Sequence, residues 1–188
     1  MRKTKHRKLK QTYFVLVDGE TEQIYLNSFK TPNLHIKPEL PKKKALIKMY
    51  KYFKQEKNNF NKSFWIIDLD VPIRENRLND VKRYKQELKD EILINNPCLE
   101  FWFLLHYEIK NFPNDCKKIE SYLKNTFDDF KTYDKSAKEM KKIIPKLKDK
   151  LSIAIKNAKN RECDFDNLMS CSEMYRFFKL TPQYKYLD

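Results

Sequence analysis

The sequence predicts an α/β fold with a mostly parallel sheet and helices on both of its faces. Two short runs, at 13–17 and 63–69, are almost wholly apolar, as is typical of strands buried on both sides. Segments with helical spacing of apolar residues alternate with these runs, which favours parallel strands joined by crossover helices. With 188 residues and 40% apolar content, the chain is long enough for one domain with a substantial core.

The first half of the chain supplies the predicted strands. The first run is followed by Ile24, Tyr25 and Phe29, which share one side of a helix. The second run, Ser-Phe-Trp-Ile-Ile-Asp-Leu, is the clearest strand of the sequence. The predicted elements are, in order, a strand at 13–17, a helix at 21–29, a short strand at 34–37, a helix at 42–57, a strand at 63–69, a helix at 79–90 and a short strand at 91–94.

The second half of the chain is predicted to be helical. The segment at 98–107, Cys-Leu-Glu-Phe-Trp-Phe-Leu-Leu-His-Tyr, is nearly all apolar and indicates a buried helix. Pro145 interrupts a long amphipathic pattern and should kink that helix or mark a restart. Helices are expected at 98–107, 117–126, 138–160 and 172–180. We therefore expect a flexible basic arm at 1–12 and a single domain at 13–188 with a helical C-terminal extension from about 138 to 188.

The charge of the chain favours a polyanionic partner. There are 40 Lys and Arg against 26 Asp and Glu, a formal net charge of +14, which is typical of DNA- or RNA-binding proteins. The same lysine-rich, glycine-poor composition also follows from AT-rich coding, so charge alone leaves open a merely solvated surface. No apolar stretch reaches transmembrane length and no signal sequence is recognised, which predicts a cytoplasmic protein without membrane contact.

The four cysteines are Cys98, Cys116, Cys163 and Cys171. None of them forms a C-x-x-C pair, which argues against a zinc site. Their wide spacing in a chain of this length predicts reduced, mostly buried thiols, as in cytosolic proteins.

Carboxylates gather where the predicted strands end. Asp18, Glu20 and Glu22 surround Gly19, the only glycine of the chain. A glycine is required where φ is positive or where a Cβ would clash. The acids could simply complement the positive N-terminus of the following helix, which would explain one or two of them but not the glycine. In parallel α/β sheets, sites form at the carboxyl ends of strands.

Asp68 and Asp70 lie at the end of the second buried strand. Two residues apart on a strand, their carboxylates would share one face. Oxygen ligands of this kind suit Mg²⁺ or Mn²⁺, with waters and a substrate phosphate completing the shell. The D-x-D pattern is common in surface turns, yet unpaired acids behind Phe-Trp-Ile-Ile are costly. The candidate metal ligands are therefore Asp18, Glu22, Asp68 and Asp70.

Three further residues are candidates for the chemistry. Glu100 interrupts an apolar helix and, if buried, needs a metal, a lysine or backbone donors as its partner. A solvent-facing position is the alternative. His106 lies on the same helix, where a lone histidine is more often structural than catalytic. Lys135 follows a predicted loop and could reach a phosphate.

Three blocks of the sequence resemble those of the RloB-like family, whose name denotes reading frames linked to restriction–modification loci. They are Val-Asp-Gly-Glu-Thr-Glu-Gln-Ile-Tyr at 17–25, Ile-Ile-Asp-Leu-Asp at 66–70 and Asn-Asn-Pro-Cys-Leu-Glu-Phe-Trp-Phe-Leu-Leu-His at 95–106. Tyr-Asp-Lys at 133–135 is similar to a fourth, weaker block. Order and spacing agree over about residues 13–140, and the third block is the most specific.

The resemblance implies a Toprim-like fold and a Mg²⁺-dependent site that hydrolyses phosphodiesters of DNA or RNA in prokaryotic antiviral defence. In that pattern Glu22 matches the second acid of the nucleases, and Asp68 and Asp70 match the D-x-D pair. Glu100 would be a further ligand or would support one, and Lys135 or His106 would neutralise the leaving oxygen. An ATPase or another defence-system protein would be the partner, and self-association stays open.

One residue departs from the Toprim pattern. Toprim proteins carry glutamate before the glycine, whereas this chain carries Asp18, which is one methylene shorter. A displacement of about 1 Å at a catalytic group can cost about 10²-fold in rate. Either the backbone compensates, or Glu20 or Glu22 takes over, or the protein is a catalytically weak nucleic-acid-binding or regulatory subunit. A structural partner of an ATPase, with charge that serves solubility, is a third alternative.

Overall fold

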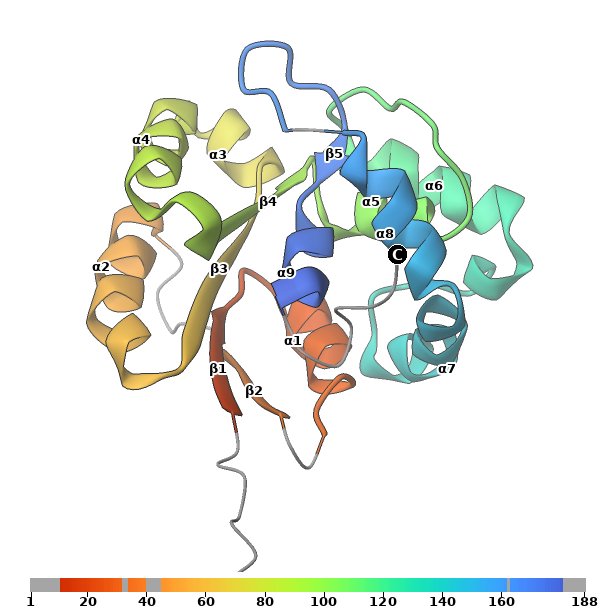
Figure 1. Ribbon diagram of the computed structural model, residues 1–188. Coiled ribbons are helices and arrows are strands. Elements are labelled where there is room, and N and C mark those ends of the chain that lie inside the picture. The colour runs from red at the N-terminus through yellow and green to blue at the C-terminus, as the bar shows by residue number, and fades with distance from the viewer. Residues whose placement is uncertain (1–10, 32–33, 40–44, 162, 181–188) are drawn as a thin grey trace, which may run out of the picture.

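The computed structural model describes residues 11–31, 34–39, 45–161 and 163–180. Its centre is a five-stranded sheet with the strand order β2-β1-β3-β4-β5 (Figure 1). The first four strands are parallel, and the last is antiparallel to its neighbour. The strands are β1 (Gln11–Leu16), β2 (Leu34–Glu39), β3 (Lys62–Asp68), β4 (Ile92–Asn96) and β5 (Cys171–Ser172). The mostly parallel α/β sheet that the sequence predicts is confirmed.

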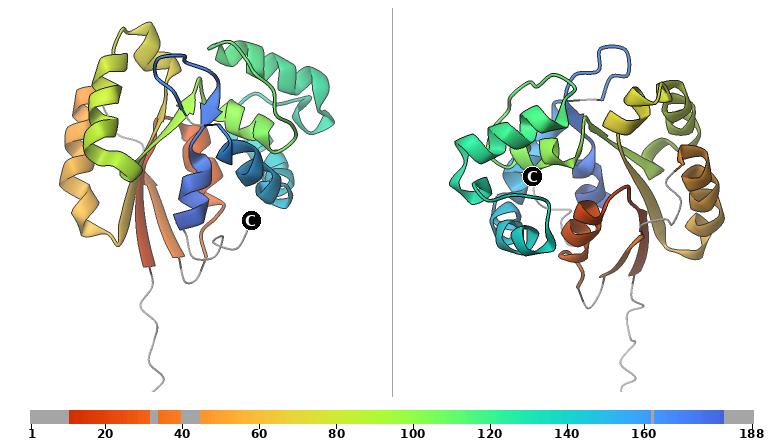
Figure 2. Two further views of the ribbon diagram at one scale, coloured as in Figure 1. Left: turned by 45° about the horizontal axis from the view of Figure 1, so that its top comes forward. Right: turned by 180° about the vertical axis from the view of Figure 1, so that it is seen from behind.

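Helices cover both faces of the sheet, as Figure 2 shows from two further sides. One face carries α2 (Leu46–Glu56), α3 (Asp70–Arg74) and α4 (Leu78–Leu88). The other face carries α1 (Glu20–Asn27), α5 (Leu99–Leu105), α6 (Cys116–Thr126), α7 (Ala137–Asp149), α8 (Leu151–Lys159) and α9 (Met174–Leu180). Strands covered on both sides must be apolar at every position, which explains the two uninterrupted apolar runs of the sequence.

The alternation of side chains along the central strands fills both cores. Phe14 and Trp65 pack beneath α2 and α4, whereas Val15 and Ile66 face the larger core on the other side of the sheet. All four are buried. Because neither face is open to water, any polar group at a strand end here is either satisfied by the protein or held at a site.

The boundaries differ from the predicted ones most clearly in two places. β1 starts at Gln11, so it includes the end of the arm predicted at 1–12. The rest of that arm, residues 1–10, lies outside the described part of the chain, and so do residues 42–44 of the helix predicted at 42–57. Pro145 lies inside α7, and the long helix breaks at Lys150 instead. The break lets α7 pack against α1 while α8 packs against α5 and α9.

Two short elements were not predicted, because neither is long enough to show a period. They are α3, with five residues, and β5, with two. Among the helices of the described residues, none has the length and hydrophobicity to cross a bilayer.

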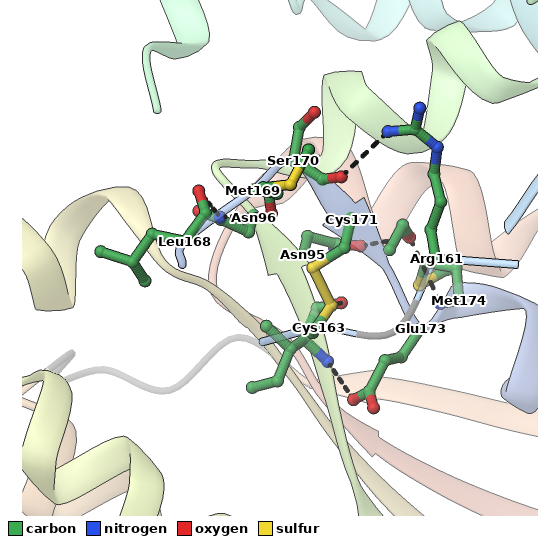
Figure 3. The surroundings of a disulfide bond; sticks show 12 residues. Asn95, Asn96, Arg161, Cys163, Leu168, Met169, Ser170, Cys171, Glu173 and Met174 are labelled. Atoms are coloured by element: carbon green, nitrogen blue, oxygen red, sulfur yellow. Dashed lines mark hydrogen bonds between the residues drawn. A yellow bond between two sulfur atoms is a disulfide. The ribbon is translucent and has the colours of Figure 1, made fainter. Parts of the chain in front are cut away.

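The expectation of four reduced thiols is wrong for two cysteines. Cys163 and Cys171 form a disulfide, with their Cα atoms 5.3 Å apart, while Cys98 and Cys116 are free. The loop between the paired cysteines folds back over the end of β4, which brings them together although their spacing matches no C-x-x-C pattern. Figure 3 shows Cys171 of β5 beside Asn95 of β4.

Candidate functional site

Three buried carboxylates meet at the carboxyl-terminal edge of the sheet. Glu22 comes from the first turn of α1, Asp68 from the end of β3, and Glu100 from the first turn of α5. Their exposed fractions are 6%, 9% and 2%. The sequence predicted Glu22 and Asp68 to lie together and left the burial of Glu100 open. We call these three residues the carboxylate cluster.

The carboxylates of the cluster act on one another. Burial, together with the charges of Glu100 and Asp18, raises the pKa of Glu22 to about 7 against hydrogen bonds that lower it. Burial and then the charges of Glu22, Asp18 and Glu100 hold the pKa of Asp68 well above its usual range. Near neutral pH the cluster therefore retains protons that isolated carboxylates would have lost.

The only glycine of the chain makes room for the cluster. Gly19 is the N-cap of α1 with φ −138° and ψ 167°, which is extended backbone that any residue adopts. A Cβ built on it would lie 2.4 Å from Glu22 Oε2. Of the two reasons that the sequence offered for a glycine, the steric one holds and a positive φ does not. Glu22 Oε2 is buried and has no hydrogen-bond partner among the described residues.

Asp68 is fixed by donors from the neighbouring strand and helix. Asn95 Nδ2 donates to Asp68 Oδ1, and the backbone N–H of Leu99 donates to Asp68 Oδ2, both at 3.1 Å. Asn95 is itself fully buried and accepts a 2.7 Å hydrogen bond from the hydroxyl of Ser172 on β5. Two chain segments far apart in sequence therefore orient one carboxylate, and neither Asn95 nor Ser172 was predicted as a site residue.

Glu100 is held by the segment that resembles the fourth block. Tyr133 donates its hydroxyl to Glu100 Oε1 at 2.8 Å, and Lys135 Nζ lies 3.0 Å from the same oxygen. Lys135 also pairs with Glu120 at 2.6 Å. Burial alone would lower the pKa of Lys135, but the charges of Glu100 and Glu120 raise it. The structure thus brings the predicted Lys135 and Glu100 together.

The backbone at this lysine is unusual. Lys135 has φ 65°, in the left-handed region that non-glycine residues rarely adopt. Its neighbours enforce this conformation, because Asp134 Oδ1 accepts from the N–H of Ser136, and Ser136 in turn caps α7. Such conformations cost free energy and concentrate at functional sites.

His106 lies in the hydrophobic core. It is fully buried at the end of α5, its Nδ1 lies 2.9 Å from the carbonyl oxygen of Trp102, and burial lowers its pKa to about 3. Its ring is therefore neutral at physiological pH. Trp102 also donates its indole N–H to the hydroxyl of Tyr25 at 2.8 Å. That bond joins α5 to α1, the two helices that carry Glu100 and Glu22.

Asp18 lies at the edge of the cluster, where its charge acts on Glu22 and Asp68, and Asp70 follows Asp68 by two residues. Asp18 is half-buried and lines a small cavity under α2 and α3 together with Met49 and Trp65. Asp70 is the first residue of α3, and its Oδ1 accepts from the N–H of Val71 at 2.8 Å. The expectation that Asp70 shares a strand face with Asp68 is wrong, because the chain turns into helical conformation at Leu69, with φ −83° and ψ −12°.

The donor set fits a hard divalent cation, although it is not a preformed cage. No group of three or more His, Cys, Asp or Glu side chains within the described ranges is arranged around one metal position. The cluster nevertheless gathers acids that repel one another and one carboxylate oxygen without a partner. A bound Mg²⁺ or Mn²⁺ would supply the missing partner and replace the retained protons.

Comparison with known proteins identifies a family. The family model described as "RloB-like protein" matches residues 13–180. This is most of the chain, and it includes the carboxylate cluster, the segment of Lys135 and the final strand β5. No curated protein and no solved structure gives a significant match.

Proposed function

The chain belongs to the RloB-like family, and from this membership and the carboxylate cluster we propose that it is a metal-dependent nuclease. Its reaction would be the hydrolysis of phosphodiesters of DNA or RNA in the cytoplasm, as part of prokaryotic antiviral defence. The observation that carries the proposal is the meeting of the buried Glu22, Asp68 and Glu100 at one sheet edge, where burial raises the pKa values of Glu22 and Asp68. Acids held this way are costly to the fold, which favours a functional reason for them.

Each residue of the cluster has a definable part in such a site. Glu22 and Asp68 would hold Mg²⁺ or Mn²⁺, and Asp18 and Asp70 would be the further ligands. When bound, the metal would supply the electrostatic stabilisation of the charge that develops on the phosphate. Asn95 keeps Asp68 oriented, because its amide donates to one carboxylate oxygen and leaves that group unable to rotate freely.

Lys135 brings a cation into contact with the cluster. Its ammonium lies 3.0 Å from Glu100, and Glu120 holds it from the other side. A phosphate that entered the site would meet this ammonium, which would balance charge on the leaving oxygen. His106 has no comparable role, because its neutral, buried ring hydrogen-bonds to the backbone of its own helix.

Incubation of the purified protein with a panel of DNA and tRNA tests the proposal directly. The panel is run with Mg²⁺, with Mn²⁺ and with EDTA, and the matched variants are Asp68→Asn in the cluster and Asp149→Asn on the exposed surface of α7. We expect cleavage only with metal, a loss of at least about 10²-fold in Asp68→Asn, and no change in Asp149→Asn. Metal-dependent cleavage that survives in Asp68→Asn would refute the assignment.

A second candidate function is a catalytically weak, nucleic-acid-binding or regulatory subunit with an ATPase partner. The observation that favours it is Asp18, whose shorter side chain lines the cavity beneath α2 and α3. Replacing Asp18 by Glu separates the two candidates. A large gain in cleavage would indicate an attenuated native site, whereas binding without cleavage in both proteins would favour the regulatory role.

A further inference from the structure

A groove of about 330 Å³ lies between α3 and the start of α6. Its walls include Asp70 and Arg74 from one helix and Asn114, Asp115, Cys116 and Lys117 from the other side. Asp70 is two residues from Asp68, so the Cα atoms of these two residues lie within about 7 Å of each other. The groove therefore begins close to the strand end that carries Asp68. Apart from Asp70, which the proposed function names as a metal ligand, none of these wall residues has been given a role above.

The two cations of the groove lack acidic partners. Arg74 and Lys117 are both exposed, and neither forms an ion pair within the ranges that the structure describes. Asp115 also lines the groove, and its Oδ1 caps α6 by accepting from the N–H groups of Lys117 and Lys118. Asp70 Oδ1 likewise accepts from the N–H of Val71. Both acids of the groove therefore hydrogen-bond to backbone N–H groups, whereas its two cations form no ion pair with the described residues.

Several other basic residues of the described chain are held in ion pairs. Lys54, Lys57 and Lys82, for example, each pair with a carboxylate at 2.6 Å. Cations without an ion pair on both walls of one groove, next to the carboxylate cluster, can bind the phosphates of a polyanionic chain on its way to that site. The shape also matters, because a groove guides a backbone along a path, whereas a scattered basic surface does not.

We propose that this groove holds the phosphodiester backbone of the nucleic-acid substrate beside the scissile phosphate, with Arg74 and Lys117 as the phosphate contacts. The inference rests on the proposed nuclease function and adds the direction from which the substrate enters. Arg74 offers a planar fork for two phosphate oxygens, and Lys117 offers a point charge on the opposite wall. These are positioning residues that bind without reading sequence.

Binding in EDTA tests the groove without requiring cleavage. Fluorescence anisotropy with a labelled oligonucleotide compares Arg74→Glu/Lys117→Glu with Lys141→Glu/Lys146→Glu. The second pair changes the net charge equally, on exposed positions of α7, a helix that does not line the groove. We expect the groove variant to lose more than about tenfold in affinity at 0.1 M salt and to lower the slope of log K against log salt by about 2. Equal losses in the two variants would overturn the proposal.

Cys116 provides an independent readout in the native sequence. Cys98 is buried and Cys163 is bonded to Cys171, so Cys116 is the free thiol with partial exposure, and it lines the groove. A saturating oligonucleotide in EDTA should slow maleimide labelling of Cys116 at least about threefold at a fixed salt concentration, and Cys116→Ser should abolish the label. Tight binding with an unchanged labelling rate would place the substrate elsewhere and overturn the proposal.

The two proposals fail in distinguishable ways. If the oligonucleotide protects Cys116 and needs Arg74 and Lys117 but is never cut with Mg²⁺ or Mn²⁺, the groove stands and the nuclease does not. If wild type cuts and the groove variant binds and cuts as well as wild type, the nuclease stands and the groove does not. DNA and RNA oligonucleotides run in parallel identify which of the two backbones the groove prefers.

Discussion

Glu22→Gln should make the folded protein more stable at alkaline pH and remove the proposed metal-dependent activity. The substitution keeps the size of the side chain and removes only its charge. The folded protein raises the pKa of Glu22 from its ordinary 4.5 to about 7. Each tenfold change in proton affinity corresponds to about 1.4 kcal/mol, so ionising this carboxyl in the fold costs about 3 kcal/mol more than ionising it in the unfolded chain.

The sign of the pH dependence follows from the raised pKa. Between pH 4.5 and 7 the folded state binds more protons at Glu22 than the unfolded state does, so stability falls as pH rises. The contribution of the protonated carboxyl is fully present below pH 4.5 and is lost above about pH 7. Glutamine does not titrate. The variant should therefore match wild type near pH 4 and exceed it by up to about 3 kcal/mol near pH 8.

Urea unfolding between pH 4 and 8.5 in EDTA measures this difference. Glu20→Gln is the matched control, because Glu20 is exposed on the same turn and its replacement should change stability by less than about 0.5 kcal/mol. Added Mg²⁺ should stabilise wild type, increasingly so as pH rises through 7, and should not stabilise Glu22→Gln. A variant that is equally stable or less stable than wild type at pH 8 would refute the reasoning, because the carboxylate would then be held by favourable contacts.

Two further substitutions probe the contacts around the cluster. Gly19→Ala should leave the fold intact and reduce cleavage at least about tenfold, since the new Cβ would lie 2.4 Å from Glu22 Oε2. Adding Glu22→Ala to this variant should restore any stability that it loses in urea unfolding. Full activity of Gly19→Ala would contradict the steric role of the glycine. Lys135→Met should cost about 1–2 kcal/mol at pH 8, because it leaves the buried Glu100 without its ammonium while Lys135 itself is 44% exposed. The control Lys131→Met breaks an exposed ion pair and should cost almost no stability. A double-mutant cycle of Lys135→Met and Glu100→Gln that shows no coupling would exclude the Lys135–Glu100 interaction.

The sequence predicted the central strands and one half of the site because both depend on local patterns. A continuous apolar run that ends in an acid marks a buried parallel strand and its carboxyl end, and this placed Asp68 beside the turn of Glu22. The glycine was informative for the same reason. A chain that avoids glycine elsewhere had to have a local cause for Gly19, and that cause is the approach of Glu22 Oε2.

What the sequence could not predict depends on long-range contacts. Asp70 follows the period of a strand, but the chain turns at Leu69, and no local residue signals that turn. Asn95 and Ser172 meet across 77 positions of sequence, so their hydrogen bond belongs to the completed sheet. Tyr133 was part of the fourth block, and its hydrogen bond to Glu100 would have been predictable only with the register of α5 known.

The position of β5 has a consequence for the synthesis of the protein on the ribosome. Asn95 can present either face of its amide to Asp68, and Ser172 selects the correct one only after β5 has paired with β4. Ser172 follows Asp68 by about 100 positions, so β5 leaves the exit tunnel well after the strand that carries Asp68. We expect nascent chains to carry an incompletely oriented Asp68 until β5 has been synthesised. If the proposed nuclease function holds, this order would restrain the site while the chain is still attached to the cell's own messenger and transfer RNA.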